Sequence, residues 1–176
     1  GRALALLGRH EEALANFDRT IALFPKMANA YNARALALKA LDRLNEALAS
    51  VEHALALDSN SSEAYSNRGN ILRSLGRNAE ALTSHDRAIA LKPNLALSHL
   101  GRALALLGEG RVTQARSSAE TAFRLDPASP EIVVGLAHFQ LLDGDWQEGW
   151  KNYEYRAQTR TPAYHPLPYP RWHGES

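Results

Sequence analysis

Seven histidines are the side chains of this 176-residue chain most able to bind a metal or transfer a proton. A metal site on one helix usually needs two histidines four positions apart or a His-Glu-x-x-His motif, and the sequence has neither. We therefore interpret all seven as surface or half-buried helix residues. They are His10, His53, His85, His99, His138, His165 and His173.

Other signals of catalysis are missing from the sequence as well. No serine lies in a Gly-x-Ser-x-Gly turn, and each glycine is isolated or in a turn, so no loop is built to cradle phosphate. The adjacent Glu11 and Glu12 are typical of a solvated helix start. The absence of cysteine excludes disulfides and thiolate chemistry. We predict that this fragment is not an enzyme and binds no cofactor and no metal.

The charge balance narrows the possible partners. The chain has 20 Lys and Arg against 19 Asp and Glu, a net charge of +1, so no strong basic field attracts nucleic acid or an anionic membrane. No uncharged stretch approaches the roughly 18 apolar residues that a membrane helix needs. The chain begins with a glycine inside a helical pattern, which indicates a fragment of a longer protein. We expect a cytoplasmic location, since the sequence has no secretory n-region.

A period of 34 residues runs through the chain and must position any binding residues. Each period contains two stretches with apolar residues at helical spacing, separated by a polar or glycine turn and ended by a proline or polar residue. The small residues at one repeated position are Ala13, Ala47, Ala81 and Ala115. A second small series is Ala35, Gly69 and Ala103. Small side chains there let two helices cross closely, so the sequence predicts an all-α stack of helical hairpins.

These repeats resemble the tetratricopeptide repeat (TPR) family, whose pattern has an aromatic residue at position 4, small residues at 8, 20 and 27, and proline at 32. Counting Ala28 as position 1, Tyr31 and Tyr65 fit the aromatic position, and Pro93 and Pro127 fit the proline. The resemblance implies a right-handed solenoid. The TPR array is expected over 1–129, made of a partial unit 1–27 and units 28–61, 62–95 and 96–129. A degenerate fifth unit or capping helices should follow at 130–158, and an extended Pro-rich and aromatic linker at 159–176.

The C-terminal part carries a second resemblance. Residues 144–156, followed by Pro-Arg-Trp-His-Gly-Glu at 170–175, are similar to the junction in bacterial TPR proteins that continue into a glycosyltransferase-like domain. Those relatives resemble heptosyltransferases and, more distantly, O-GlcNAc transferase. This implies an alternative function, a substrate-presenting arm of an enzyme whose catalytic domain is missing from this chain. We expect Trp146, Trp150 and Tyr153 to cap the array, and a stacking site for a sugar or nucleotide remains open.

The favoured prediction is a protein–protein interaction scaffold that binds a peptide or partner segment in a concave groove. Helical geometry predicts that positions 2, 5, 9 and 12 of each first helix face this groove. The candidate residues are Asn29, Asn32, Leu36 and Lys39, then Glu63, Ser66, Asn70 and Arg73, then Leu97, Leu100 and Leu104. Asn67 joins them because asparagines at position 6 hold peptide backbone in O-GlcNAc transferase, although Ala33 and Gly101 break that series here.

Two expectations concern how this groove is used. Leu97, Leu100, Leu104 and Leu107 should form an exposed apolar strip that a peptide ligand, the chain's own tail or a second copy covers. Self-association through the end of the array therefore stays open. Lys39 and Arg73 can grip a carboxylate, with plain solvated charge as the alternative.

Charged columns should also stabilise the stack. Arginines recur at position 7 on the side facing the partner helix, and such half-buried guanidinium groups need acceptors. An acidic column has the same 34-residue spacing. The arginines are Arg34, Arg68 and Arg102, and the acids are Asp18, Glu52, Asp86, Glu120 and Glu154. We predict structural Arg–carboxylate pairs, either within or between repeats.

Overall fold

The computed structural model describes residues 8–155, and within that range every regular element is a helix. This confirms the predicted all-α class. Residues 1–7, which begin the predicted partial unit, and the predicted linker at 159–176 lie outside the described residues. The helices are α2 (His10–Leu23), α3 (Ala28–Ala40), α4 (Leu44–Leu57), α5 (Ser62–Ser74), α6 (Asn78–Leu91), α7 (Ala96–Gly108), α8 (Val112–Leu125), α9 (Pro130–Leu142) and α10 (Trp146–Tyr153).

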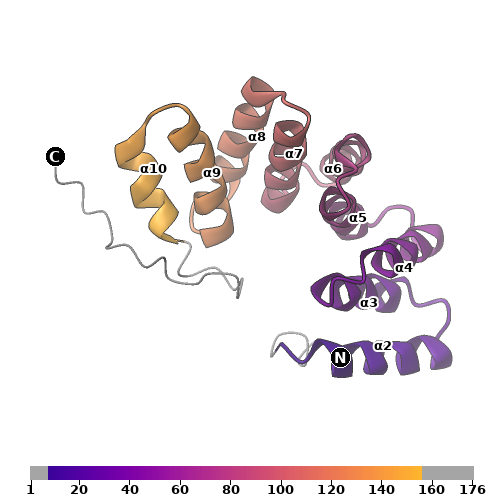
Figure 1. Cartoon of the computed structure of the whole chain (residues 1–176). Coiled ribbons are helices and arrows are strands. Elements are labelled where there is room, and N and C mark those ends of the chain that lie inside the picture. The colour runs from indigo at the N-terminus through magenta and orange to yellow at the C-terminus, as the bar shows by residue number, and fades with distance from the viewer. Residues whose placement is uncertain (1–7, 156–176) are drawn as a thin grey trace.

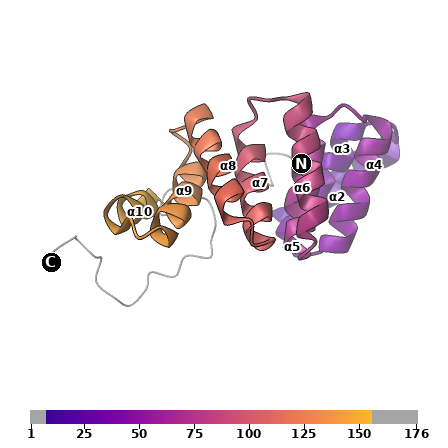
Figure 2. The ribbon, with the colours of Figure 1, turned by 90° about the horizontal axis from the view of Figure 1, so that it is seen from above.

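The helices pair into hairpins that form an arch (Figure 1). The first helices of the hairpins, α3, α5, α7 and α9, line its inner side and contact one another in that order. The second helices, α4, α6, α8 and α10, lie on the outer side. Seen from above, the hairpins from α5–α6 to α9–α10 follow one another in chain order (Figure 2). The inner side is therefore a concave surface built from several consecutive repeats.

Each hairpin turn has the same backbone conformation. One residue per repeat has a positive φ, at Gly8, Asp42, Gly76, Gly110 and Gly144, and these positions are 34 residues apart. The residue after it returns its N–H to the helix, as Arg77 does to the carbonyl of Leu72 at 2.9 Å. This is the Schellman arrangement, which needs a left-handed residue and therefore favours glycine. Asp42, with φ 58°, is the one non-glycine residue with a positive φ in the described range.

Small residues let the two helices of a hairpin approach closely. Ala35, Ala47, Ala81 and Ala103 are all fully buried, as expected from the sequence. Larger apolar side chains, such as Leu38 and Leu72, fill the remaining space and are also fully buried. Close backbone approach thus leaves no room for larger side chains at the repeated alanine positions.

His85 occupies an unusual place in this core. It lies on α6 with an exposed fraction of 0%, and neither ring nitrogen has a hydrogen-bond partner. A Cβ atom added to Gly69 or to Gly101 would collide with its ring. Burial, together with the charge of Arg73, lowers the pKa of His85 from 6.5 to about 4, although Asp86 opposes this. His85 is thus a neutral packing residue held between α5 and α7, and its complete burial differs from the surface or half-buried position expected for every histidine.

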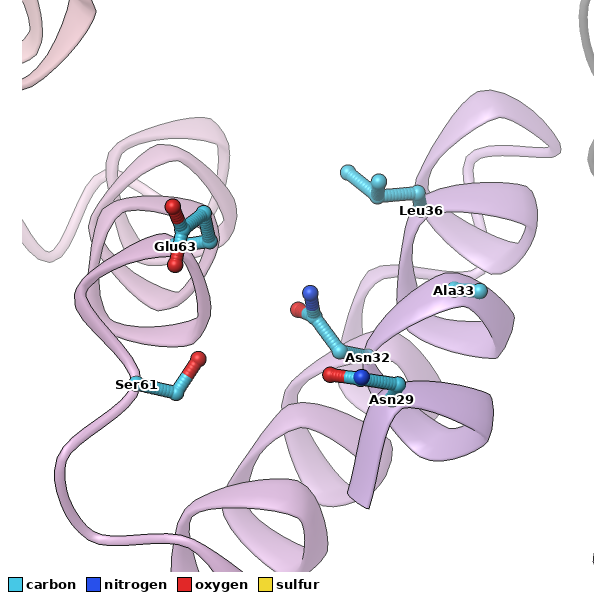
Figure 3. A pocket seen from close by; sticks show the side chains of 6 residues that line it. All are labelled: Asn29, Asn32, Ala33, Leu36, Ser61 and Glu63. Carbon is cyan, nitrogen blue, oxygen red and sulfur yellow. The ribbon is translucent and has the colours of Figure 1, made fainter. Parts of the chain in front are cut away.

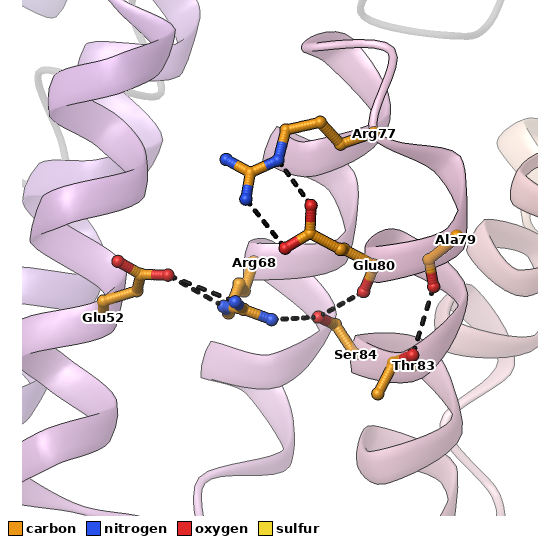
Figure 4. Close-up of polar contacts among 7 residues, drawn as sticks. All are labelled: Glu52, Arg68, Arg77, Ala79, Glu80, Thr83 and Ser84. Atoms are coloured by element: carbon orange, nitrogen blue, oxygen red, sulfur yellow. Dashed lines mark hydrogen bonds and ion pairs between the residues drawn. The ribbon is translucent and has the colours of Figure 1, made fainter.

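The predicted Arg–carboxylate pairs are confirmed, and each joins two repeats. Arg34 donates from Nε to Asp18 at 2.7 Å, and Arg102 does the same to Asp86 at 2.7 Å. Arg68 donates from Nη2 to Glu52 at 3.1 Å and from Nη1 to Ser84 Oγ at 2.8 Å (Figure 4). Each arginine therefore connects the second helix of the preceding hairpin to the first helix of its own. In the fifth repeat, Leu136 occupies the arginine position, so the column ends there.

Candidate functional site

An open pocket lies on the concave side, between α3 and the start of α5 (Figure 3). Its volume is about 380 Å³, within the range of pockets that accept a small ligand or a few side chains. Its lining residues are Asn29, Asn32, Ala33, Leu36, Ser61 and Glu63. Figure 3 shows Asn32 and Leu36 on one side of the space and Ser61 and Glu63 on the other.

The α3 side of the pocket follows from helical spacing. Asn29, Asn32 and Leu36 are three and four residues apart, so their side chains project from one face of α3. Leu36 is 45% exposed, an uncommon position for a leucine in an otherwise well-packed helix. The Oδ1 atom of Asn32 accepts a hydrogen bond from Asn67 Nδ2 at 2.9 Å, which links α3 to α5. The pocket thus combines an exposed apolar side chain with fixed amide groups.

The α5 side of the pocket is set by the start of that helix. Ser61 Oγ caps α5 by accepting from the N–H of Ala64 at 3.2 Å. The carboxylate of Glu63 accepts from Lys92 Nζ at 3.3 Å and from Ser62 Oγ at 3.2 Å. The hydrogen bond from its own backbone N–H, with those from Lys92 and Ser62, lowers the pKa of Glu63 against the effect of burial. Glu63 is therefore ionised at neutral pH and already has a counter-ion.

The structure brings together four of the predicted groove residues, Asn29, Asn32, Leu36 and Glu63. Sequence reasoning did not assign Ala33 and Ser61 to the pocket. The signal for Ser61 was available, because a serine directly before a helical stretch is a typical N-cap whose side chain lies at the helix mouth.

Lys39 and Arg73 lie further along the same helix faces. Both are half-buried and belong to the last turns of α3 and α5. Burial, and then the nearby charge of Arg73, lower the pKa of Lys39. The Nε atom of Arg73 is buried and has no hydrogen-bond partner. Asn70, one turn before Arg73, accepts from Ser74 through its carbonyl oxygen at 3.0 Å.

Comparison with known families decides the class of this chain. The profile described as "Tetratricopeptide repeat" matches residues 1–59 and 100–165, and a second profile of the same description matches 51–83. A profile described as "TPR repeat" matches residues 69–110. The chain belongs to the tetratricopeptide repeat family.

Solved structures agree with the TPR assignment. A thermophilic TPR protein from Thermus thermophilus, TTC0263, is 25% identical with a TM-score of 0.80, over 91% of this chain and 88% of that one. YrrB, described as a TPR protein with an unusual peptide-binding site, has 20% identity and a TM-score of 0.62, over 89% and 81%. The APC/C hetero-tetramer Cut9–Hcn1 has 14% identity and a TM-score of 0.81, over 89% and 30%. None of the curated proteins matches in sequence.

Two groove residues of this TPR protein are not where the sequence placed them. Leu100 was expected in an exposed apolar strip but is only 8% exposed. Its side chain fills the space beside Gly135 of α9, so that a Cβ atom there would collide with it. Ser66 was expected to face the groove and is 7% exposed. Both occupy position 5 of their helix, although Asn32 at the same position of α3 lines the pocket.

The prediction that four leucines form one exposed apolar strip is therefore wrong. Leu97 is 52% exposed, whereas Leu104 and Leu107 are half-buried and Leu100 is buried. The apolar contact that the strip was expected to offer a partner is used instead by α9. Among the predicted groove residues, Leu36 and Leu97 remain the exposed leucines.

The C-terminal aromatic residues lie on the last described hairpin. The Tyr153 ring packs edge-on against Trp150 and His138, with ring centroids 5.7 and 5.5 Å apart. Partial burial lowers the pKa of His138. Trp146 is 58% exposed and Trp150 is 36% exposed. Capping of the array by these residues stays a prediction.

Within 8–155, no group of three His, Cys, Asp or Glu side chains is arranged to hold a metal ion. Among the helices of that range, none combines the length and the apolar character needed to cross a bilayer.

Proposed function

We propose that this TPR protein is a protein–protein interaction scaffold that binds an extended peptide segment of a partner across α3 and α5. The observation that carries the proposal is the open pocket of about 380 Å³ on the concave side. It offers the features that an extended peptide uses. An exposed leucine contacts an apolar side chain, and amide and hydroxyl groups hydrogen-bond to the peptide backbone.

The open shape of the pocket suits an extended peptide better than a compact ligand. The pocket is open to solvent, and the concave surface continues from it over α7 and α9, so a longer chain can extend from it along these helices (Figure 1). The Asn32–Asn67 hydrogen bond fixes both amides before binding, which reduces the entropy lost on association. Two proteins of similar fold support a binding role, since YrrB is described with an unusual peptide-binding site and Cut9 is described in a hetero-tetramer with Hcn1.

Leu36 provides the sharpest test, because its side chain is exposed and changing it should not disturb the core. Peptides selected from a random display library on the full chain should bind at least about 10-fold more weakly to Leu36→Asp, as measured by calorimetry. Leu57→Asp is the matched control, since Leu57 is 39% exposed at the end of the outer helix α4. Equal affinity for the wild type and Leu36→Asp would place binding outside this pocket.

The substrate-presenting arm of a glycosyltransferase-like enzyme remains the alternative. It is supported only by the sequence patterns at 144–156 and 170–175, and the whole of the second pattern lies outside the described residues. Reading the gene beyond the codon for Ser176 tests it, because a nucleotide-sugar-binding α/β domain should follow directly. Self-association is tested by size-exclusion chromatography at several protein concentrations, and a concentration-dependent elution volume would support it.

A further inference from the structure

A second pocket lies at the junction of the third and fourth repeats, between the outer helices α6 and α8. Its volume is about 320 Å³, enough for a large side chain or a small ligand. Arg102 of α7 connects its two walls, because it donates to Asp86 of α6 at 2.7 Å and to Ser118 of α8 at 2.6 Å. The pocket is also lined by Ile89, His99, Ser117 and Thr121. None of these residues lines the concave pocket, so the two pockets are separate.

The ring of His99 has a fixed orientation in this pocket. Its Nε2 atom lies 2.8 Å from the carbonyl oxygen of Pro93, and a carbonyl only accepts, so Nε2 is the donor. Tyr31 occupies the same position, number 4, in the second repeat, and its hydroxyl donates to the carbonyl of Pro25 at 3.1 Å. The same contact therefore holds the polar end of the ring in both repeats, which leaves the ring face able to stack.

In the two preceding repeats, a planar group at position 26 packs on the ring at position 4. The ring centroids of His53 and Tyr31 are 4.2 Å apart in the second repeat. In the third repeat, the guanidinium carbon of Arg87 lies 5.9 Å from the ring centroid of Tyr65. An aromatic ring and a guanidinium both interact favourably with an aromatic face. Position 4 thus has a planar partner from its own repeat in both cases.

The fourth repeat lacks this internal partner. Its position 26 is Thr121, whose short side chain cannot extend over a ring. In the described part of the chain, no ring or cation pairs with His99. The pocket therefore lies where the other repeats place their own planar group.

The polar groups around His99 discriminate between possible planar ligands. Asp86 accepts from Arg102 through Oδ1, which leaves Oδ2 as an acceptor for a ligand. Arg124 donates to Thr121 Oγ1 at 2.9 Å, so one guanidinium lines the pocket and another lies beside it. A further cation, such as an arginine of a partner, would be repelled by both. A neutral ring with a hydroxyl donor avoids this repulsion and can still donate to Asp86.

We propose that this pocket is a second protein-binding site, which accepts a tyrosine side chain of a partner. The tyrosine ring packs on His99, its hydroxyl donates to Asp86, and Ile89 contributes apolar surface. The chain already contains the same pair of residue types with the positions exchanged, since His53 packs on Tyr31. Tyrosines that fill a pocket in this way are frequent hot spots of protein interfaces. The site does not depend on the proposed groove between α3 and α5.

The experiment selects peptides from a random display library on the full chain and counter-selects them on Thr121→Tyr. In that variant the new ring should cover His99, as His53 covers Tyr31. The surviving peptides should be enriched in tyrosine, and calorimetry should show about 10-fold or more weaker binding to Thr121→Tyr. Thr113→Tyr is the matched control, because Thr113 is an exposed residue of the same helix outside the pocket lining. It should leave the affinity within about 2-fold.

Two further comparisons test the individual contacts. Replacing the tyrosine of a selected peptide by phenylalanine should weaken binding about 10-fold, because the hydrogen bond to the Asp86 carboxylate is lost. His99→Val should weaken it to a similar extent, and Val133 at the equivalent position of the fifth repeat shows that valine fits there. His99→Tyr should keep the affinity within about 3-fold, since it retains a ring at position 4, as at Tyr65.

Several outcomes would overturn the tyrosine site. If no selected peptide distinguishes Thr121→Tyr from the wild type, or if the survivors are not enriched in tyrosine, the proposal is wrong. Survivors that bind His99→Val as tightly as the wild type contradict the stacking contact and overturn it as well. Circular dichroism spectra of the variants should match the wild type, because Thr113 is exposed and His99 and Thr121 are only half-buried.

Leu36→Asp separates this site from the proposed groove. The peptides that survive counter-selection should bind Leu36→Asp as tightly as the wild type, since Leu36 lines the concave pocket alone. Survivors that lose affinity for Leu36→Asp would lie in the groove, and the second site would be wrong. Failure of the groove leaves the tyrosine site intact, because peptides that bind between α6 and α8 do not contact α3.

Discussion

The imidazole of His85 lies so close to Gly69 that a Cβ atom on Gly69 would be 2.5 Å from Nε2 of the ring. Because His85 is fully buried, its ring has no free space into which to move. This contact fixes the separation of α5 and α6 in the middle of the arch.

Gly69→Ala should therefore destabilise the fold by about 1–3 kcal/mol through overpacking. Chemical unfolding of the wild type, Gly69→Ala, His85→Ala and the double variant gives the coupling between the two sites. The added methyl group should be tolerated once the ring is removed. In the fourth repeat an alanine, Ala119, already occupies the position equivalent to His85. Strictly additive effects would show that the ring is not what excludes a side chain at Gly69.

The burial of His85 should make stability depend on pH. Its pKa is about 4 in the folded protein and 6.5 ordinarily, so between these values the unfolded state binds the extra proton. Stability should therefore be constant above pH 6.5 and fall as the pH is lowered toward 4, by about 2 kcal/mol between pH 7 and pH 5. His85→Phe should remove this difference, since Phe17 occupies the equivalent position of the first repeat. Urea titrations of the wild type and of His85→Phe at pH 7 and pH 5 measure the change in stability. Identical pH dependence in these two proteins would contradict the prediction.

Arg68, which joins two repeats, should stabilise the folded array more than Arg77, whose ion pair is exposed. Arg68→Met removes the bonds to Glu52 and Ser84 and should cost about 1 kcal/mol, because the Arg68 side chain is only 23% exposed and Ser84 is buried. Arg77→Met removes only an exposed pair with Glu80 within one helix and should cost no more than about 0.5 kcal/mol. Urea midpoints at low and high salt compare the two, and an equal loss in both variants would argue against a role in joining repeats.

The hairpin turn at Asp42 should contribute least to the stability of the fold. It has φ 58°, whereas glycine occupies the same turn position at Gly8, Gly76, Gly110 and Gly144. Asp42→Gly should raise stability by about 0.5–1 kcal/mol, since glycine adopts this conformation without strain. Gly110→Ala is the converse test: a Cβ there would meet no atom within 4 Å, so its expected loss of about 1 kcal/mol comes from the backbone alone. Thermal unfolding measures both variants, and a neutral Gly110→Ala would show that the turn conformation is not limiting.

The sequence by itself determined the repeating unit and its internal packing. The 34-residue period, the helical spacing and the small residues at Ala47 and Ala81 are local signals, because each depends on contacts within one hairpin. The Arg–carboxylate columns were also predictable, since equal spacing brings like positions together in every repeat. The left-handed turn residues shared the same period and could have been predicted, although Asp42 interrupts the glycine series.

Only the tertiary structure decided which side chains remain exposed on the concave surface. Leu100 and Ser66 have the helical phase of groove residues, yet both are buried, and Leu100 packs beside Gly135 of the next repeat. The angle between hairpins decides whether a residue at the edge of a helix face meets solvent or the next helix, and that angle depends on packing between residues far apart in sequence. The same packing brought Asn32 to Asn67 and paired each arginine with an acid of the preceding repeat.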